Sequence, residues 1–153
     1  MATPKTLIDA EGKWYGESVL NLSHLPENER IRPSDSSLTI QVEPRQTYAK
    51  VDYVWNEDGP QSGALLICGQ ASSGIVTGAW ADAWHQSSAA MHLTGDGMEG
   101  VVRLSGEYEP TGYPKWGWRL EFELAEDKLL FRMFNISPEG EEEWAVRAEY
   151  SRG

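Results

Sequence analysis

The last third of the chain alternates between large apolar and polar side chains with a period of two. The apolar positions are Trp116, Trp118, Leu120, Phe122 and Leu124 in one segment, and Trp144, Val146, Ala148 and Tyr150 in another. A period of two places successive apolar side chains on one face of an extended strand. Turn-forming residues at 126–127 and 138–140 separate these segments from the apolar run 129–136. The pattern predicts an antiparallel meander with one polar face and one aromatic face.

From residue 38 onward, similar short segments follow one another, separated by turn-forming residues. About ten short strands at spacings of about ten residues are typical of a sandwich or a barrel. No long helical period interrupts them, which excludes folds built from strand–helix–strand units. Links of hairpin length favour an up-and-down barrel over a Greek-key sandwich. We predict one all-β domain over residues 1–153, an up-and-down antiparallel barrel of about 8–10 strands, with room inside for a small ligand.

The stretch 23–37, between the first two predicted strands, departs from this pattern. It is polar and contains Pro26 and Pro33, so we predict a loop in which residues 26–30 form one or two helical turns. It lies either as a flap over one end of the barrel or as a plain surface connection. Its few apolar side chains predict that it is mobile.

Charge and cysteine content exclude several partners. The net charge of −11 argues against nucleic acid, which requires a surplus of Lys and Arg on one face, and against anionic membrane surfaces. Cys68, the one cysteine, lies in the apolar run 64–69, so we expect it to be buried. A lone cysteine forms no internal disulfide, and the first residues show no export-signal pattern. These features predict a cytoplasmic protein.

A short motif near the start resembles a known family signature. Gly12-Lys13-Trp14 is similar to the G-x-W motif of the lipocalin and calycin barrels, which include fatty-acid-binding-protein-like folds. The resemblance implies that Trp14 plugs the closed end of the barrel and packs against an arginine past the last strand. Arg152 is the first candidate for that arginine and Arg147 the second. The segments 14–16, 80–82 and 150–152 also resemble an uncharacterised bacterial family of lipocalin-like domains, which implies small-molecule binding.

Aromatic side chains form the largest group of candidate ligand contacts. The chain has seven tryptophans, and strand alternation places all except Trp14 on one face. Either these rings form an ordinary core, or they line a cavity suited to an apolar or ring-containing ligand. The candidate ligand-binding residues are Tyr53, Trp55, Trp80, Asp82, Trp84, Trp116, Trp118, Trp144 and Tyr150.

Asp82 is the candidate for polar chemistry within this aromatic set. It alternates with Trp80 and Trp84, so it points inward if they do. A carboxylate in an aromatic pocket must be paired, hydrogen-bonded or protonated. It is either a structural ion pair, with Arg132 as a possible partner of undecided direction, or an anchor for a ligand hydroxyl or amine, or a general base.

The histidines and known catalytic motifs add little. His24, His85 and His92 do not have the spacing of metal ligands, so we expect no metal and no cofactor. His92 is a conceivable haem ligand, but a surface position is the simpler reading. No nucleophile motif and no phosphate-binding loop is present.

Three functions fit these features. The first is a binding protein that holds a small hydrophobic or aromatic molecule in a cavity of a few hundred Å³. The second is an isomerase or cyclase that uses the same cavity, with Asp82 as acid or base. The third is a homodimeric interaction module whose barrel is filled by its own side chains.

Overall fold

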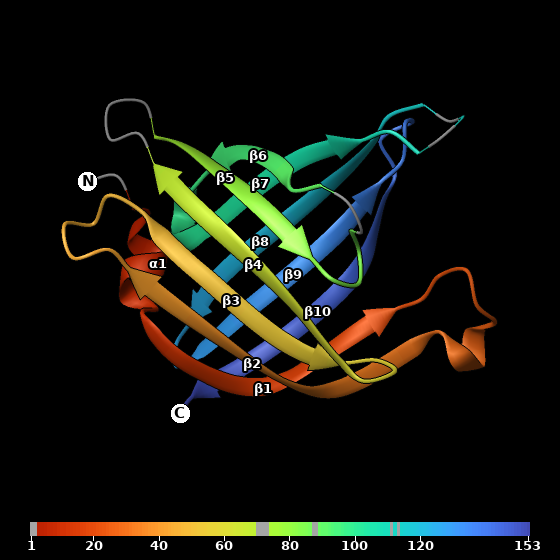
Figure 1. The fold of residues 1–153 in the computed structure, drawn as a ribbon, viewed down its shortest axis with the longest axis horizontal. Coiled ribbons are helices and arrows are strands. Elements are labelled where there is room, and N and C mark those ends of the chain that lie inside the picture. Colours follow the sequence, from red (N-terminus) through yellow and green to blue (C-terminus); the bar gives the residue numbers. More distant parts are fainter. Residues whose placement is uncertain (1–2, 70–73, 87–88, 111, 113) are drawn as a thin grey trace.

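The computed structural model describes residues 3–69, 74–86, 89–110, 112 and 114–153. Ten antiparallel strands form one closed barrel (Figure 1). The strands are β1 Gly12–Asn21, β2 Ile31–Val42, β3 Ala49–Asn56, β4 Pro60–Gly69, β5 Ile75–Asp82, β6 Met91–Asp96, β7 Val101–Tyr108, β8 Trp116–Ala125, β9 Lys128–Ile136 and β10 Glu142–Arg152. Three short helices accompany them: α1 Lys5–Asp9 and two 3₁₀ turns, η1 Glu27–Glu29 and η2 Met98–Gly100. Within the described ranges, no helix is long and apolar enough to cross a membrane.

Each strand pairs with the next one along the chain, and β1 pairs with β10 to close the barrel. This connectivity confirms the predicted up-and-down barrel. The closing seam requires a glycine, because a Cβ at Gly16 would lie 1.9 Å from the backbone oxygen of Glu149. Glycine, which has no side chain, therefore allows β1 to approach the backbone of β10 closely at this position.

The second strand begins earlier than the sequence predicted. β2 starts at Ile31 and pairs with β1 from Asn21↔Ile31 to Gly12↔Ile40, so only the first part of the predicted loop 23–37 is irregular. The polar residues misled the prediction because their hydroxyls have partners. Ser36 is buried on the inner face, where its hydroxyl donates to the Val54 carbonyl (2.8 Å) and lies 2.9 Å from the Tyr150 hydroxyl. A satisfied serine is compatible with a barrel interior.

One end of the barrel is closed by α1 and Trp14. Trp14 is 1% exposed, and its indole N–H donates to the Ala10 carbonyl at 2.8 Å. The Arg152 guanidinium lies 4.5 Å from the centre of the Trp14 ring and donates to the carbonyls of Glu11 and Asp9, both at 2.6 Å. The last strand thereby holds the N-terminal helix over the ring. Arg147, the alternative partner, does not reach Trp14.

The middle of the barrel is filled by side chains. Phe122 and Phe131 stack with ring centres 4.6 Å apart, and Tyr53 meets Phe131 edge-on at 5.1 Å. The void beside Tyr53, Trp55 and Phe131 measures about 10 Å³, which is about the least that accommodates one water. The rings at this level therefore form a packed core.

Two residues expected on the inner face lie outside. A register shift between Trp144 and Val146 places Trp144 opposite Phe134 on the outer face of the barrel, where the Arg147 guanidinium lies 4.0 Å from its ring centre. The alternation rule fails there because a bulge adds one residue to the count. Cys68 is exposed, because Leu65 and Ile67 are the inward residues of β4. An apolar run does not by itself show which residues point inward.

We expect Trp14→Ala to lower the free energy of unfolding by about 3–5 kcal/mol, because it leaves a large cavity under α1. Trp144→Ala removes the same side chain from the outer surface and is the matched control, with an expected loss of about 1 kcal/mol from the lost cation–π contact. Urea unfolding of both variants measures the difference. Equal losses in the two variants would contradict the role of Trp14 as the plug.

Candidate functional site

The polar centre of the structure lies where β5 ends, at the barrel end opposite α1 (the right-hand end in Figure 1). Asp82 is the last residue of β5 and is only 4% exposed. Its Oδ1 accepts hydrogen bonds from the backbone N–H groups of Trp84 and His85, both at 2.8 Å. An aspartate that bonds the backbone two and three residues ahead fixes a tight turn. The strand therefore turns inward directly after Asp82 and brings His85 over the barrel opening.

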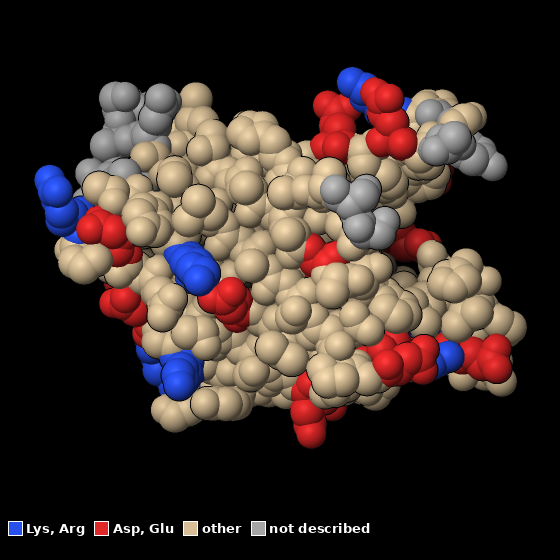
Figure 2. Space-filling view, in the orientation of Figure 1, with Lys and Arg blue, Asp and Glu red and all other residues tan. Residues whose placement is uncertain are grey.

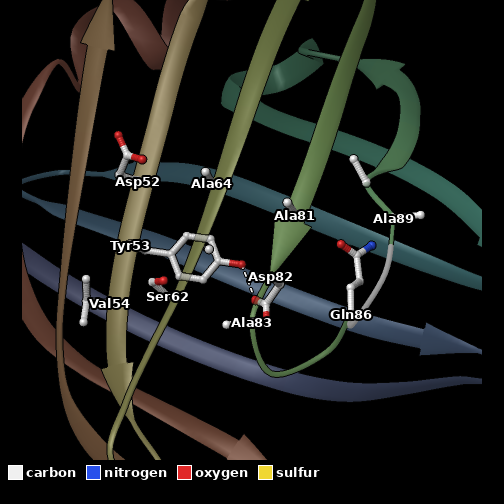
Figure 3. Close-up of a pocket in the computed structure, with 12 residues that line it drawn as sticks. Asp52, Tyr53, Val54, Ser62, Ala64, Ala81, Asp82, Ala83, Gln86 and Ala89 are labelled. Atoms are coloured by element: carbon white, nitrogen blue, oxygen red, sulfur yellow. Dashed lines mark hydrogen bonds between the residues drawn. The ribbon is translucent and has the colours of Figure 1, made fainter.

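A chain of side-chain contacts runs from this carboxylate into the core. The Tyr53 hydroxyl donates to Asp82 Oδ2, as the dashed line in Figure 3 shows. The Trp80 indole N–H donates in turn to the Tyr53 oxygen at 2.8 Å. His85 Nδ1 lies 3.1 Å from Asp82 Oδ1. One carboxylate thus orders a tyrosine on β3, a tryptophan on its own strand and the following turn.

The environment of Asp82 keeps it ionised. Burial alone would raise the pKa of its carboxyl group, but the His85 imidazole and the Tyr53 hydroxyl outweigh burial and hold that pKa below its ordinary value. Burial raises the pKa of the Tyr53 phenol well above its ordinary value, and the negative charge of Asp82 adds to the shift. At neutral pH the pair is therefore a carboxylate that accepts a hydrogen bond from a neutral phenol.

Aromatic rings surround His85 on several sides. Its ring centre lies 5.1 Å from Trp118, 6.0 Å from Trp80 and 6.1 Å from Trp55. Trp80 and Trp118 stack on each other, with centres 5.5 Å apart and planes inclined by 13°. The imidazole therefore lies in an aromatic box whose walls come from β3, β5 and β8.

A cavity of about 420 Å³ opens beside this box. Trp80, His85, Met91, Tyr108 and Trp118 are among the residues that line it. A second cavity of about 140 Å³, which reaches the β1–β2 loop at His24, also contacts His85 and Trp118. We call the two together the mouth cavity. Figure 2 shows acidic side chains above and below the hollow at this end of the molecule.

Asp82 does not line the mouth cavity. It faces a shallow groove of about 680 Å³ over β3, β4 and β5, with Ala64, Ala81 and Gln86 in its lining (Figure 3). Asp82 already accepts three hydrogen bonds, out of the roughly four that a carboxylate can accept. Its predicted role as a ligand anchor stays a prediction. His85 and Gln86 are the polar side chains that the turn presents to the mouth cavity.

The structure brings together some of the predicted ligand contacts and separates others. Tyr53, Trp55, Trp80 and Trp118 are buried around His85, whereas Tyr150 lies deeper, beside Ser36. Trp116 is half-buried and pairs with Tyr108. Trp84 does not face inward with Trp80, because it follows the end of β5 and is 36% exposed on the turn. Trp144 has its ring on the outer face, as described above, although the residue also borders the 140 Å³ part of the mouth cavity.

Arg132, the possible partner of Asp82, also points outward. Its guanidinium donates to Glu121 at 3.1 Å and to Glu123 at 2.8 Å. Glu121 accepts a further hydrogen bond from Arg119, at 2.8 Å. These groups form an ion-pair network on the outer face of β8 and β9, away from the mouth cavity.

His85 is the site residue that sequence reasoning missed. The spacing of the histidines predicts no metal site, and by itself it assigns His85 no other role. The usable signal was its position three residues after an inward aspartate at a strand end, which is the spacing of an aspartate-capped turn. Gln86, Met91 and Tyr108 were also missed, since they carry no recognisable motif.

Among the described residues, no group of three or more His, Cys, Asp or Glu side chains is placed to hold a metal ion. His92 is exposed, with its inward neighbours Met91 and Leu93 packed against the core. A comparison with family models and a search of curated proteins both found no match to this chain.

The pKa shift of Asp82 predicts a pH-dependent stability. Because its folded-state pKa is lowered, the carboxylate stabilises the fold above its unfolded pKa of about 3.9, and this contribution is lost as pH falls through the folded pKa. We expect Asp82→Asn to unfold about 1–3 kcal/mol more easily at pH 7 and to lose less stability than wild type between about pH 5 and pH 2. Asp52→Asn, on the outer face of β3, is the control. Parallel pH profiles for wild type and Asp82→Asn would contradict the assignment.

Proposed function

We propose that the protein binds a small planar, largely apolar molecule in the mouth cavity. The observation that carries this proposal is the 420 Å³ cavity bordered by the stacked rings of Trp80 and Trp118. That volume lies within the usual range of small-molecule sites, from about 300 to 1,000 Å³. The ligand binds at the open end of the barrel, above the packed aromatic core.

The lining suits a flat ring. Trp118 and Tyr108 offer aromatic surface, and Met91 offers a flexible, polarisable side chain that adapts to the edge of a ring. His85, Gln86 and Glu107 add polar groups among these apolar surfaces. A few polar groups on an apolar wall are what orient a small ligand in its site.

The resemblance to lipocalin-like domains supports the same role by analogy of fold. A barrel closed at one end by a tryptophan–arginine pair and open at the other has the general arrangement of a ligand-holding barrel. We therefore propose membership of that class. The analogy does not extend to the ligand, since one fold serves many functions.

An enzyme that moves a proton is the second candidate, and one observation favours it. His85 Nδ1 lies 3.1 Å from a buried, ionised carboxylate. A carboxylate beside an imidazole orients the ring and stabilises its protonated form during proton transfer. In this alternative His85 takes a proton from one atom of the ligand and returns it to another, which is an isomerisation. Asp82 acts as a positioning residue rather than as the acid or base.

We expect naphthalene to bind saturably at one site per chain and to shift the indole N–H signals of Trp80 and Trp118 in NMR spectra of protein with ¹⁵N-labelled tryptophan. Met91→Trp fills part of the mouth cavity and should weaken binding about tenfold or more. Met98→Trp places the same ring on exposed η2, at the closed end, and should leave affinity unchanged. Thermal unfolding of both variants checks that the barrel is intact.

Two results would contradict the proposal: naphthalene shifts that do not saturate, or equal weakening by both variants. The enzyme alternative has a separate test once a natural ligand is known. His85→Gln should then abolish isomerisation while the dissociation constant changes little. If both the reaction and binding were lost together, His85 would act in binding alone.

A further inference from the structure

Unpaired buried polar atoms gather at the open end of the barrel. Within the described ranges, six buried side-chain nitrogen or oxygen atoms have no hydrogen-bond partner: Asn21 Oδ1, Arg30 Nε, Trp55 Nε1, His85 Nδ1, Gln86 Oε1 and Trp118 Nε1. All belong to the end of β1, the β1–β2 loop, the end of β3, the turn after β5 or the start of β8, which meet at this end. His85 Nδ1 differs from the other five, because Asp82 Oδ1 lies 3.1 Å away as an electrostatic partner, although not in hydrogen-bond alignment.

The closed end is different, because the Trp14 indole and the Arg152 guanidinium both have partners. Trp14 donates to Ala10, and Arg152 donates to two carbonyls. Leaving a buried donor unpaired costs about 1–3 kcal/mol. Such groups are rare in native proteins, and each one calls for an explanation such as a water, an ion or a ligand. Their concentration at one end indicates that a partner is missing there.

Asn21, His85, Gln86 and Trp118 each have an unpaired atom and line the mouth cavity, but the atoms of Asn21 and Gln86 are acceptors and His85 has Asp82 beside it. Trp118 is the one whose unpaired atom is an indole N–H. It is 8% exposed, its Nε1 has no partner among the described residues, and it borders both parts of the mouth cavity. Trp55 also has an unpaired indole N–H, but it borders the void of about 10 Å³ in the packed core and is not among the described residues that line the mouth cavity. An indole nitrogen is a donor only. The partner that Trp118 lacks is therefore a hydrogen-bond acceptor.

The charges around the mouth cavity restrict this acceptor further. Glu107 and Glu143 lie among its lining residues, and no Lys or Arg does so in the part of the chain that the structure describes. The whole chain carries a net charge of −11. The acidic side chains would repel an anionic ligand, and no Lys or Arg among the described lining residues offers it a permanent positive charge.

We propose that the ligand is an uncharged planar molecule with a hydrogen-bond acceptor on its edge, a carbonyl oxygen or an aromatic ring nitrogen, which accepts from Trp118 Nε1. This inference rests on the proposed binding function and specifies the chemistry of its ligand. The ring stacks in the mouth cavity, and the acceptor satisfies the buried indole N–H. Apolar shape and one directed hydrogen bond together select the ligand.

The test compares two probes of the same shape, naphthalene and quinoline, which differ in that quinoline has a ring nitrogen in place of one C–H. Their dissociation constants are measured by NMR at pH 7.5 on wild type, Trp118→Phe and Trp55→Phe. Phenylalanine keeps an aromatic ring at each position and removes the N–H. The ratio of the two constants isolates the hydrogen bond from the general effect of a smaller ring.

We expect Trp118→Phe to weaken quinoline about three- to tenfold more than naphthalene. Trp55→Phe should change both affinities equally. In wild type, quinoline should move the Trp118 indole proton to lower field than naphthalene does, with the signal assigned from its absence in Trp118→Phe. The anionic probe 2-naphthoate should bind more weakly than either.

Each other outcome has a distinct meaning. If both probes bind wild type saturably and Trp118→Phe changes them equally, the acceptor proposal is overturned and the binding function stands. Tighter binding of 2-naphthoate than of quinoline would overturn the uncharged class. If neither neutral probe binds in a saturable way, the proposed function itself fails, and this inference fails with it.

Discussion

The buried carboxylate of Asp82 is the interaction on which the open end of the barrel depends. An ionised carboxylate inside an aromatic interior is costly unless its oxygens are hydrogen-bonded. Here one oxygen accepts from two backbone N–H groups of the turn, and the other accepts from Tyr53. The requirement to satisfy this charge therefore fixes the turn after β5, the tyrosine on β3 and, through that hydroxyl, the indole of Trp80. The position of His85 follows from the turn.

The two ends of the barrel differ in whether their polar side-chain groups have hydrogen-bond partners. At the closed end, Trp14 and Arg152 have backbone carbonyls as partners, so the ring and the cation contribute to stability. At the open end, the buried indole N–H groups of Trp55 and Trp118 have no partner among the described residues. A fold tolerates such groups where function requires them and where the rest of the structure supplies the stability. The filled core between the two ends is what makes this division possible.

Sequence reasoning recovered the fold because a period of two is a direct consequence of strand geometry, and most strands keep it. On β5 it also predicted that Trp80 and Asp82 share the inner face while Ala79 and Ala81 point outward. It was wrong about Trp144, because one bulge reverses the facing of every residue before it. It was wrong about Cys68, because a continuous apolar run does not show which of its alternate residues point inward. The local pattern of apolar and polar residues reveals neither the bulge in β10 nor the outward direction of Cys68.

The site was harder to predict than the fold, since it depends on contacts between residues far apart in the chain. Asp82 was a recognisable candidate, but the sequence did not show its partners: the carboxylate accepts three hydrogen bonds and positions the groups that donate them. The packed rings below also hold Trp80 and Trp118 in place before any ligand arrives. Side chains already ordered lose little entropy on binding, so even a small cavity with one directed hydrogen bond offers useful affinity. A barrel filled in its middle is thus consistent with ligand binding, because the filling makes a rigid platform of its open end.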